Sequence, residues 1–129
     1  MMIDRRAFLG VSAAAIFGGK GIPELGSGAT AQMYGLIGKI VAVEGRREEL
    51  AEILLEGAGG MPGCMSYVVA LDTEDEDALW VTEVWETEAR HRESLARPSV
   101  QEAIGKGRPL IRELGERFVT TPIGGHGLE

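Results

Sequence analysis

The sequence predicts a single α+β domain with the element order β-α-β-β-α-β, which is the ferredoxin-like arrangement. A chain of 129 residues has room for one hydrophobic core. Runs rich in β-branched and apolar residues alternate with segments whose apolar residues recur at helical spacing. A short acidic turn joins the second and third runs, which indicates a hairpin. This order places four antiparallel strands in one sheet, with the helices on one face.

The first half of the domain predicts a strand, a helix and a second strand. Residues 34–43 are mostly β-branched or apolar, which is typical of a strand. Residues 46–58 predict a helix with one buried stripe, because apolar residues recur at helical spacing with charged residues between them; they are Leu50, Ile53, Leu54 and Leu55. A glycine-rich stretch ends that helix. Residues 64–72 predict a strand with two fairly apolar faces, so we expect both faces to be covered.

The third predicted strand, residues 78–86, carries different side chains on its two faces. Successive strand residues point to opposite sides of a sheet. One face therefore holds Leu79, Val81, Glu83 and Trp85, and the other holds Trp80, Thr82 and Val84. The two tryptophans are expected to point away from each other.

The last part of the domain predicts an interrupted helix and a final strand. Thr87 has the side chain of an N-cap for a helix that starts one residue later. Pro98 breaks this helix, and Ser99 is expected to cap a second piece whose apolar stripe extends to residues 110–111. Residues 118–123 predict the last strand.

A four-stranded sheet with helices on one side leaves its other face uncovered. That face is apolar here, and a large exposed apolar face requires a cover. Pairing two sheets face to face buries both. We therefore expect a homodimer with an enclosed interface that resembles a β-barrel.

The N-terminal segment has the features of an export signal. Residues 4–9 read Asp-Arg-Arg-Ala-Phe-Leu, which resembles the twin-arginine consensus, and a moderately apolar stretch follows. Residues 29–31, Ala-Thr-Ala, offer a signal-peptidase site. We expect a signal peptide over residues 1–31 and a mature domain over residues 32–129, exported by the twin-arginine machinery to the periplasm or the cell exterior. The alternative is an ordinary N-terminal helix packed on the domain.

Charge and composition exclude several classes of function. The chain has 13 basic and 20 acidic residues; three basic and two acidic residues lie in the predicted leader, so the mature domain has 10 basic and 18 acidic residues. This acidic balance argues against a nucleic-acid partner. No apolar run is long enough for stable insertion into a membrane. A single cysteine, Cys64, excludes an internal disulfide. Two distant histidines and one cysteine predict no metal site.

Several short blocks, in order, resemble one family. They are 61–67 (Met-Pro-Gly-Cys-Met-Ser-Tyr), 80–86 (Trp-Val-Thr-Glu-Val-Trp-Glu), His91 with Ser94-Leu95, and 108–111 (Arg-Pro-Leu-Ile). Together they resemble the antibiotic biosynthesis monooxygenase domain, and more narrowly its quinol monooxygenase members. The resemblance covers about residues 34–122. It implies a dimeric α+β barrel and the oxidation of a small quinol or phenolic compound by O2, without a cofactor.

Five residues are the candidates for the site. His91 is the only histidine in the ordered part of the domain, and an imidazole suits the removal of a phenolic proton. Trp85 and Tyr67 lie on neighbouring strands and can stack on a planar substrate. Glu83 shares the Trp85 face, and Trp80 lies on the opposite one. We predict His91 as the catalytic base and the other four as substrate-binding residues, with one tryptophan at the pocket and the other at the dimer interface.

Each candidate also has a purely structural interpretation. His91 can be a half-exposed helix residue, and Trp85 and Tyr67 can belong to the core or to the dimer interface. Glu83 can be a buried carboxylate paired with Arg108 or Arg112. Cys64 fits a small buried strand residue better than a reactive thiol.

The sequence contains no asparagine. Better-understood relatives of the family, including those that degrade haem, use an asparagine, a tryptophan and a histidine in the pocket. This chain cannot assemble that set, so haem degradation is disfavoured. The second hypothesis is therefore a non-catalytic dimer of the same fold, with a ligand-binding or stress-related role.

Overall fold

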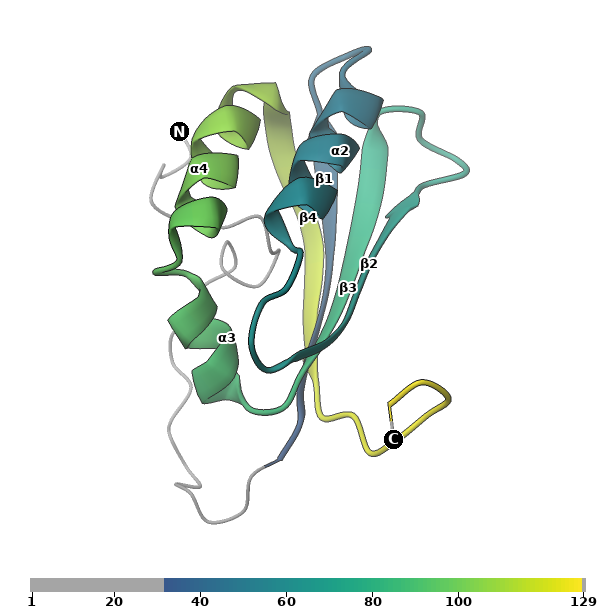
Figure 1. Ribbon diagram of the computed structural model, residues 1–129. Helices are drawn as coiled ribbons and strands as arrows, with labels where there is room; N and C mark the ends of the chain where they lie inside the picture. Colours follow the sequence, from purple (N-terminus) through teal and green to yellow (C-terminus); the bar gives the residue numbers. More distant parts are fainter. Residues whose placement is uncertain (1–31, 129) are drawn as a thin grey trace.

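One antiparallel sheet organises the protein. In the computed structural model, which describes residues 32–128, the sheet has four strands in the order β2-β3-β1-β4 (Figure 1). The predicted signal peptide over residues 1–31 lies outside the described residues. The strands are β1 (Tyr34–Ala42), β2 (Cys64–Leu71), β3 (Ala78–Trp85) and β4 (Ile111–Thr120). This confirms the predicted ferredoxin-like α+β fold.

In the described part of the chain, the helices lie on one side of this sheet, as Figure 1 shows. They are α2 (Arg47–Gly57), α3 (Glu88–Ser94) and α4 (Pro98–Gly107), and a single 3-10 turn, η2 (Arg108–Leu110), follows α4. Leucines of α2 and apolar residues of α4 meet the inner face of β1 and β3 in one core; the fully or nearly fully buried members include Leu36, Ile40, Leu50, Leu54, Leu79, Val81, Val100 and Ile104. The stripe predicted on α2 is confirmed for Leu50 and Leu54, which are buried, but not for Leu55, which is 53% exposed.

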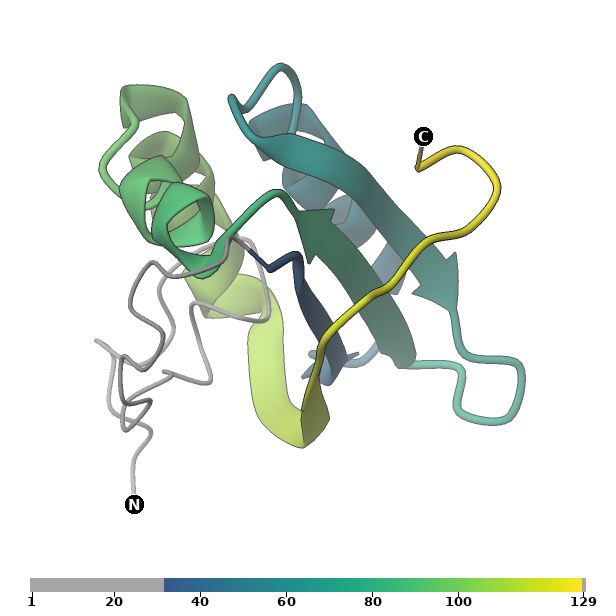
Figure 2. The ribbon, with the colours of Figure 1, turned by 90° about the horizontal axis from the view of Figure 1, so that it is seen from below.

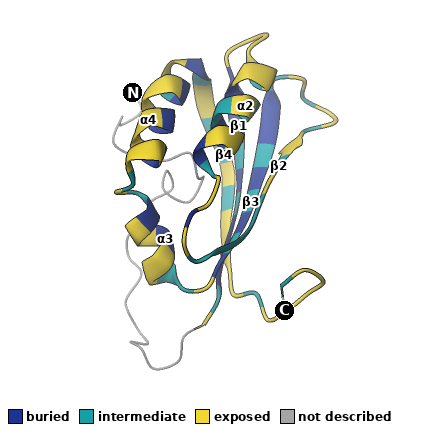
Figure 3. Ribbon diagram, in the orientation of Figure 1, coloured by how far each residue is buried: buried dark blue, intermediate teal, exposed yellow. Residues whose placement is uncertain are grey.

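Burial along β3 alternates as its sequence predicts. Leu79, Val81, Glu83 and Trp85 are buried under the helices, whereas Trp80, Thr82 and Val84 are only partly buried on the other face. Figure 3 shows buried and partly buried residues along β3, and more exposed residues along the edge strands β2 and β4. The pleat thus separates the two tryptophans.

Two predictions for the last third of the chain are wrong. The final strand is Ile111–Thr120, not 118–123, so residues 110–111 belong to η2 and β4 and not to a helical stripe. The second helical piece starts at Pro98 with Arg97 at its N-cap position, without a side-chain hydrogen bond to the helix, so Ser99 lies inside the first turn and is not the cap. Proline is favoured at the first helical position because its missing N–H has no partner there anyway. The predicted N-cap Thr87 is confirmed: its side chain accepts a bond of 3.2 Å from the Arg90 amide.

The outer face of the sheet carries a continuous row of paired residues. Val68, Thr82, Ile37 and Phe118 are cross-strand neighbours on β2, β3, β1 and β4. The two ends of the row are exposed, Val68 at 51% and Phe118 at 52%. The segment after β4 runs along this side of the sheet, away from the helices (Figure 2).

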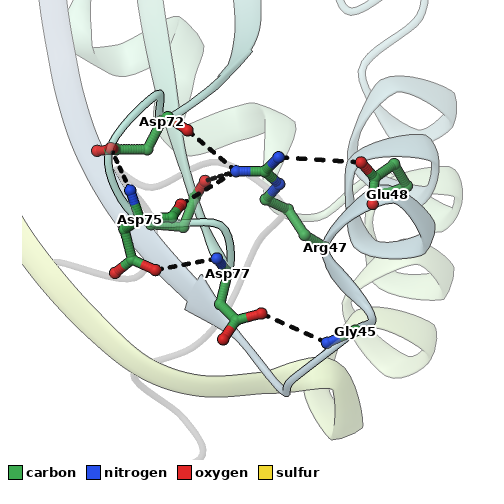
Figure 4. A network of polar contacts seen from close by, with 7 residues as sticks. Gly45, Arg47, Glu48, Asp72, Asp75 and Asp77 are labelled. Atoms are coloured by element: carbon green, nitrogen blue, oxygen red, sulfur yellow. Dashed lines mark hydrogen bonds and ion pairs between the residues drawn. The ribbon is translucent and has the colours of Figure 1, made fainter.

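One arginine at the start of α2 forms hydrogen bonds with the β2–β3 hairpin (Figure 4). Arg47 Nη1 donates to the carbonyl oxygens of Asp72, Asp75 and Ala78 at 3.1, 3.1 and 3.2 Å. The hairpin carboxylates bind backbone amides: Asp72 accepts from the amides of residues 74 and 75, and Asp75 accepts from the amide of Asp77. The predicted acidic hairpin is therefore an ordered turn in which Asp72 and Asp75 cap backbone amides of the turn itself.

Candidate functional site

The candidate site begins with two neighbours on the inner face of β3. Glu83 and Trp85 are two residues apart on a strand, so their side chains point to the same side. The indole Nε1 of Trp85 donates to Glu83 Oε1 at 2.8 Å. Both side chains have no exposed surface. A carboxylate and an indole are thus fixed together in the core at the end of the strand.

His91 reaches this pair because α3 starts directly after β3. Thr87 caps the helix, and its first turn brings His91 back over the sheet. The imidazole meets the Trp85 ring edge-on, with centroids 5.4 Å apart and planes at 75°. Its other neighbour is Tyr34, at 5.6 Å and 41°. His91 is only 4% exposed, so the half-exposed interpretation is wrong.

Burial determines the protonation state of His91. Loss of hydration, and to a smaller degree the positive charge of Arg92, lower the pKa of His91 from 6.5 to about 4. The imidazole is therefore neutral at physiological pH and can accept a proton, but as a weaker base than an ordinary histidine. Its predicted role as catalytic base remains a prediction.

Strand β2 adds two partly buried groups to the same cluster. Tyr67 lies opposite Glu83 in the β2–β3 register, and Cys64 lies opposite Trp85. Burial and then the negative charge of Glu83 raise the pKa of Tyr67 well above its usual value. The same two causes raise the pKa of Cys64 to about 11. Cys64 is thus a protonated thiol with little nucleophilic character, as the sequence suggests.

The fifth predicted site residue, Trp80, lies apart from the other four. Its side chain is on the outer face, where Nε1 donates to Asp72 Oδ2 at 2.8 Å. The Lys39 ammonium lies 5.9 Å from its ring centroid. The structure therefore brings together His91, Trp85, Glu83 and Tyr67, and it does not bring Trp80 to them.

Two further observations revise the site predicted from sequence. Tyr34 was missed, although the β1–β3 register places it directly opposite Trp85. Burial, followed by the negative charge of Glu88, raises its pKa. The suggested Glu83–Arg112 pair is not observed: Arg112 lies 3.9 Å from Asp77 at the hairpin end of the sheet.

Among residues 32–128, no group of three acidic, histidine or cysteine side chains lies close enough together to ligate a metal ion. None of the helices in that part of the chain is long and apolar enough to span a membrane. A cavity of about 290 Å³ lies between α2 and α4 and is lined by residues such as Glu56, Glu102 and Lys106, none of which belongs to the cluster around Trp85.

The fold and the cluster together define a class: a ferredoxin-like α+β protein with acid, imidazole and phenol groups buried around one indole. The model of a family described as antibiotic biosynthesis monooxygenase matches residues 33–106. The chain belongs to this family. Family membership supports a monooxygenase role in general terms.

Solved structures agree with this assignment. A protein of Chloroflexus aurantiacus J-10-fl named "putative Antibiotic biosynthesis monooxygenase" is 58% identical; the match covers 75% of this chain and 99% of that one, with a TM-score of 0.74. Proteins of the same name from Bacteroides thetaiotaomicron VPI-5482 and Nitrosomonas europaea share the fold, at 18% and 14% identity and TM-scores of 0.64 and 0.63. Those matches cover 74% and 75% of this chain and 93% and 94% of the others. No functionally curated protein matches the chain.

Proposed function

We propose that this protein is a cofactor-independent monooxygenase that oxidises a small quinol or phenolic compound with O2. The observation that supports this best is the buried cluster of Glu83, Trp85 and His91, closed by Tyr34 and Tyr67. An electron-rich ring reduces O2 readily once it is deprotonated, so the protein has to bind the ring, accept its proton and exclude bulk water. Every group that these tasks need is present in the cluster.

The overall reaction balances without a further reductant. A quinol loses two hydrogen atoms and gains one oxygen atom as it becomes a hydroxyquinone. The second oxygen atom of O2 leaves with those two hydrogen atoms as water. The aromatic faces of Trp85 and Tyr67 suit the ring, and both His91 and Glu83 can accept a proton.

Oxygen uptake tests this function directly. The purified full chain is incubated with a panel of quinols and phenols, while O2 consumption and product absorbance are recorded. We expect uptake of one O2 per molecule of substrate for at least one compound. Unchanged turnover in His91→Ala would show that His91 is not the base. No uptake with any compound would contradict the proposed function.

A non-catalytic ligand-binding or stress-related role is the second candidate. The weak basicity of His91 and the absence of asparagine from the chain favour it. Under this alternative, the protein binds aromatic compounds saturably and consumes no O2. Calorimetry on the same panel, run beside the O2 electrode, distinguishes the two candidates.

We further propose that the outer face of the sheet pairs with that of a second copy. The exposed apolar row from Val68 to Phe118 supports this, and Trp80 would lie in the interface. Light scattering on the full chain should give twice the 13.8 kDa monomer mass. Phe118→Lys should yield a monomer, whereas Leu55→Lys, an equally exposed position on α2, should not. A monomeric wild type would refute the pairing.

We propose that export by the twin-arginine machinery delivers the folded domain to the periplasm or the cell exterior. Residues 4–9 and the Ala-Thr-Ala site at 29–31 support this. Cell fractionation should find the processed chain outside the cytoplasm, and replacing Arg5 and Arg6 with lysine should retain the precursor inside. Export that persists in the double variant would argue against this route.

A further inference from the structure

The two edges of the sheet differ in chemistry. Strands β2 and β4 are its outermost strands. Strand β4 pairs irregularly with β1 and carries four charged residues, which are Arg112, Glu113, Glu116 and Arg117. Charges and irregular pairing protect an edge strand from adding another strand. Strand β2 has no charged residue and no proline along its length, and its pairing with β3 is regular over residues 66–71. It therefore lacks the usual protection of an edge.

The outer edge of β2 has no partner strand in the single chain. Within the described residues, β2 pairs with β3 alone. Two of its apolar side chains also remain exposed, Val68 at 51% and Leu71 at 43%. The N–H and C=O groups along such an edge are a template on which a further strand can form. An uncharged, apolar edge of this kind calls for a strand to cover it.

The segment that follows β4 also lacks contacts within its own chain. We call residues 121–128 the C-terminal arm; it runs along the outer side of the sheet, away from the helices (Figure 2). Ile123 in this arm is 94% exposed. One backbone hydrogen bond lies inside the arm, from the Leu128 amide to the Gly125 carbonyl at 3.0 Å, and none joins residues 122–128 to another described part of the chain.

The start of the arm is directed by a glycine on β1. Gly35 pairs with Val84 on one side and with Thr120 on the other, and it lies on the outer face of the sheet. A β-carbon at Gly35 would clash with Thr120 Oγ1 and with the ring of Pro122. The missing side chain therefore lets the chain cross β1 onto the outer face. The arm leaves the domain on the side where a second copy would pack.

A second copy of this chain is the occupant that fits the edge of β2. If the outer faces pair about a two-fold axis along the strands, β4 of each copy lies across from β2 of the other, because the rotation reverses the strand order. Each chain carries both the arm and the edge, so one exchange covers both edges in a closed dimer. Neither the arm nor β2 contains an acidic residue, a lysine or an arginine, so their contact buries no unpaired charge of this kind.

We propose that residues 121–125 of each copy add a strand to the free edge of β2 in the other copy. The assignment rests on the pairing of outer faces proposed above, and it names the segment and the edge that hold the two copies together. Pro122 is compatible with an added edge strand when its nitrogen faces away from β2. Because N–H groups alternate in direction along a strand, Thr121 and Ile123 then donate to β2.

Ile123→Pro in the full chain tests this assignment, because it removes a donor that the added strand needs. Sedimentation velocity measures the dimer dissociation constant, which we expect to rise at least tenfold. Hydrogen exchange measured on the dimer should show slow exchange of alternate β2 amides in the wild type and at least tenfold faster exchange in the variant. The amides of the central strand β1 should exchange at the same rate in both proteins.

Three variants sharpen the test. His126→Pro introduces the same residue beyond the added strand and should dimerise as the wild type does. Ile123→Val keeps the N–H group and an apolar side chain, and it should also match the wild type. A chain that ends at Thr121 should behave like Ile123→Pro. Folding of these variants is not at risk, because the arm forms no backbone hydrogen bond with the rest of its own described chain.

The outcomes separate this inference from the proposed pairing. If the wild type is a dimer and Ile123→Pro keeps both its dissociation constant and its slow exchange in β2, the inference is wrong and the pairing stands. A weaker dimer with unchanged exchange in β2 would place the arm elsewhere on the partner and would also overturn the inference. Slow exchange in β2 that persists on dilution to monomers would mean that the chain covers its own edge. If the wild type is monomeric, the pairing fails and the inference fails with it.

Discussion

The acids at the two ends of the sheet differ in surroundings and in partners. At the hairpin end, Asp72 and Asp75 are partly exposed and accept backbone N–H groups of their own turn (Figure 4). At the other end, Glu83 is fully buried and accepts the indole N–H of Trp85. The hairpin acids are accounted for by local structure, because short acidic side chains are favoured in turns. The turn chemistry that accounts for Asp72 and Asp75 does not account for Glu83, which lies in the middle of a regular strand and whose partner is a core side chain.

The largest expected effect is at the buried end. Trp85→Ala removes a fully buried indole and deprives Glu83 of its donor, so we expect the free energy of unfolding to fall by about 3–5 kcal/mol. Trp80→Ala, on the partly exposed face, should cost less than half as much. Urea unfolding of both variants measures the difference. Equal losses would mean that the two faces are not as distinct as their burial indicates.

At the hairpin end of the sheet, Arg47 should contribute to the stability of the fold and should not affect the binding of a ligand at the other end. Arg47→Met removes the donor to three carbonyl oxygens, and we expect a loss of about 2–3 kcal/mol. Arg46→Met removes only an exposed pair with Glu49 and should cost under about 0.5 kcal/mol. Thermal unfolding compares the two variants. Reduced O2 uptake with quinols in a folded Arg47→Met protein would contradict the separation of the two ends.

Lowering the pH should reduce the stability of the folded protein, because His91 is buried in its neutral form. Its folded-state pKa of about 4 lies below the ordinary 6.5, so burial of the neutral imidazole contributes fully to stability above pH 6.5. As the pH falls from 6.5 towards 4, the unfolded chain takes up a proton that the folded one resists, and about 2 kcal/mol should be lost by pH 5. Unfolding curves between pH 4.5 and 7.5 measure this slope. His91→Phe should flatten it, and His126→Gln, at an exposed position, should not. A wild-type curve without this slope would contradict the buried neutral state.

The smallest expected effect concerns the N-cap of α3, which is Thr87. Thr87→Ala removes the N-cap acceptor for the Arg90 amide and should cost about 1 kcal/mol. Because α3 carries His91, we also expect faster amide hydrogen exchange in its first turn. Thr73→Ala, an exposed threonine in the hairpin, should change neither quantity. If both variants behaved alike, the cap would have no part in holding His91 over Trp85.

Sequence patterns predicted most of the fold because its central strands are regular. The alternation along β3 correctly separated Trp85 from Trp80, and the stripe on α2 correctly gave its buried leucines. Strand β4 was misplaced for a physical reason. It is an edge strand, whose solvent side tolerates charges such as Arg112 and Glu113, and irregularities in its pairing with β1 break the alternation.

The candidate site was harder to predict because it depends on register and burial. Alternation put Glu83 and Trp85 on one face, but only the pairing of β1 with β3 brings Tyr34 to Trp85. Similarly, no pattern in the helix distinguishes a buried His91 from an exposed one. Its low pKa follows mainly from burial, to which Tyr34 on the distant strand β1 contributes together with Trp85 on the strand just before the helix.

The separation of the two tryptophans has an optical consequence. Trp85 is shielded from solvent, with its N–H bound to a carboxylate and its edge against an imidazole, whereas Trp80 is partly exposed on the opposite face. Intrinsic fluorescence of this chain is therefore a sum of two emitters in unlike surroundings. In the single chain a dissolved quencher reaches Trp80 far more easily than Trp85, and pairing of the outer face with a second copy would shield Trp80 as well. Emission that resists quenching reports on the cluster, and emission that is quenched reports on the outer face of the sheet, so one unlabelled sample records both.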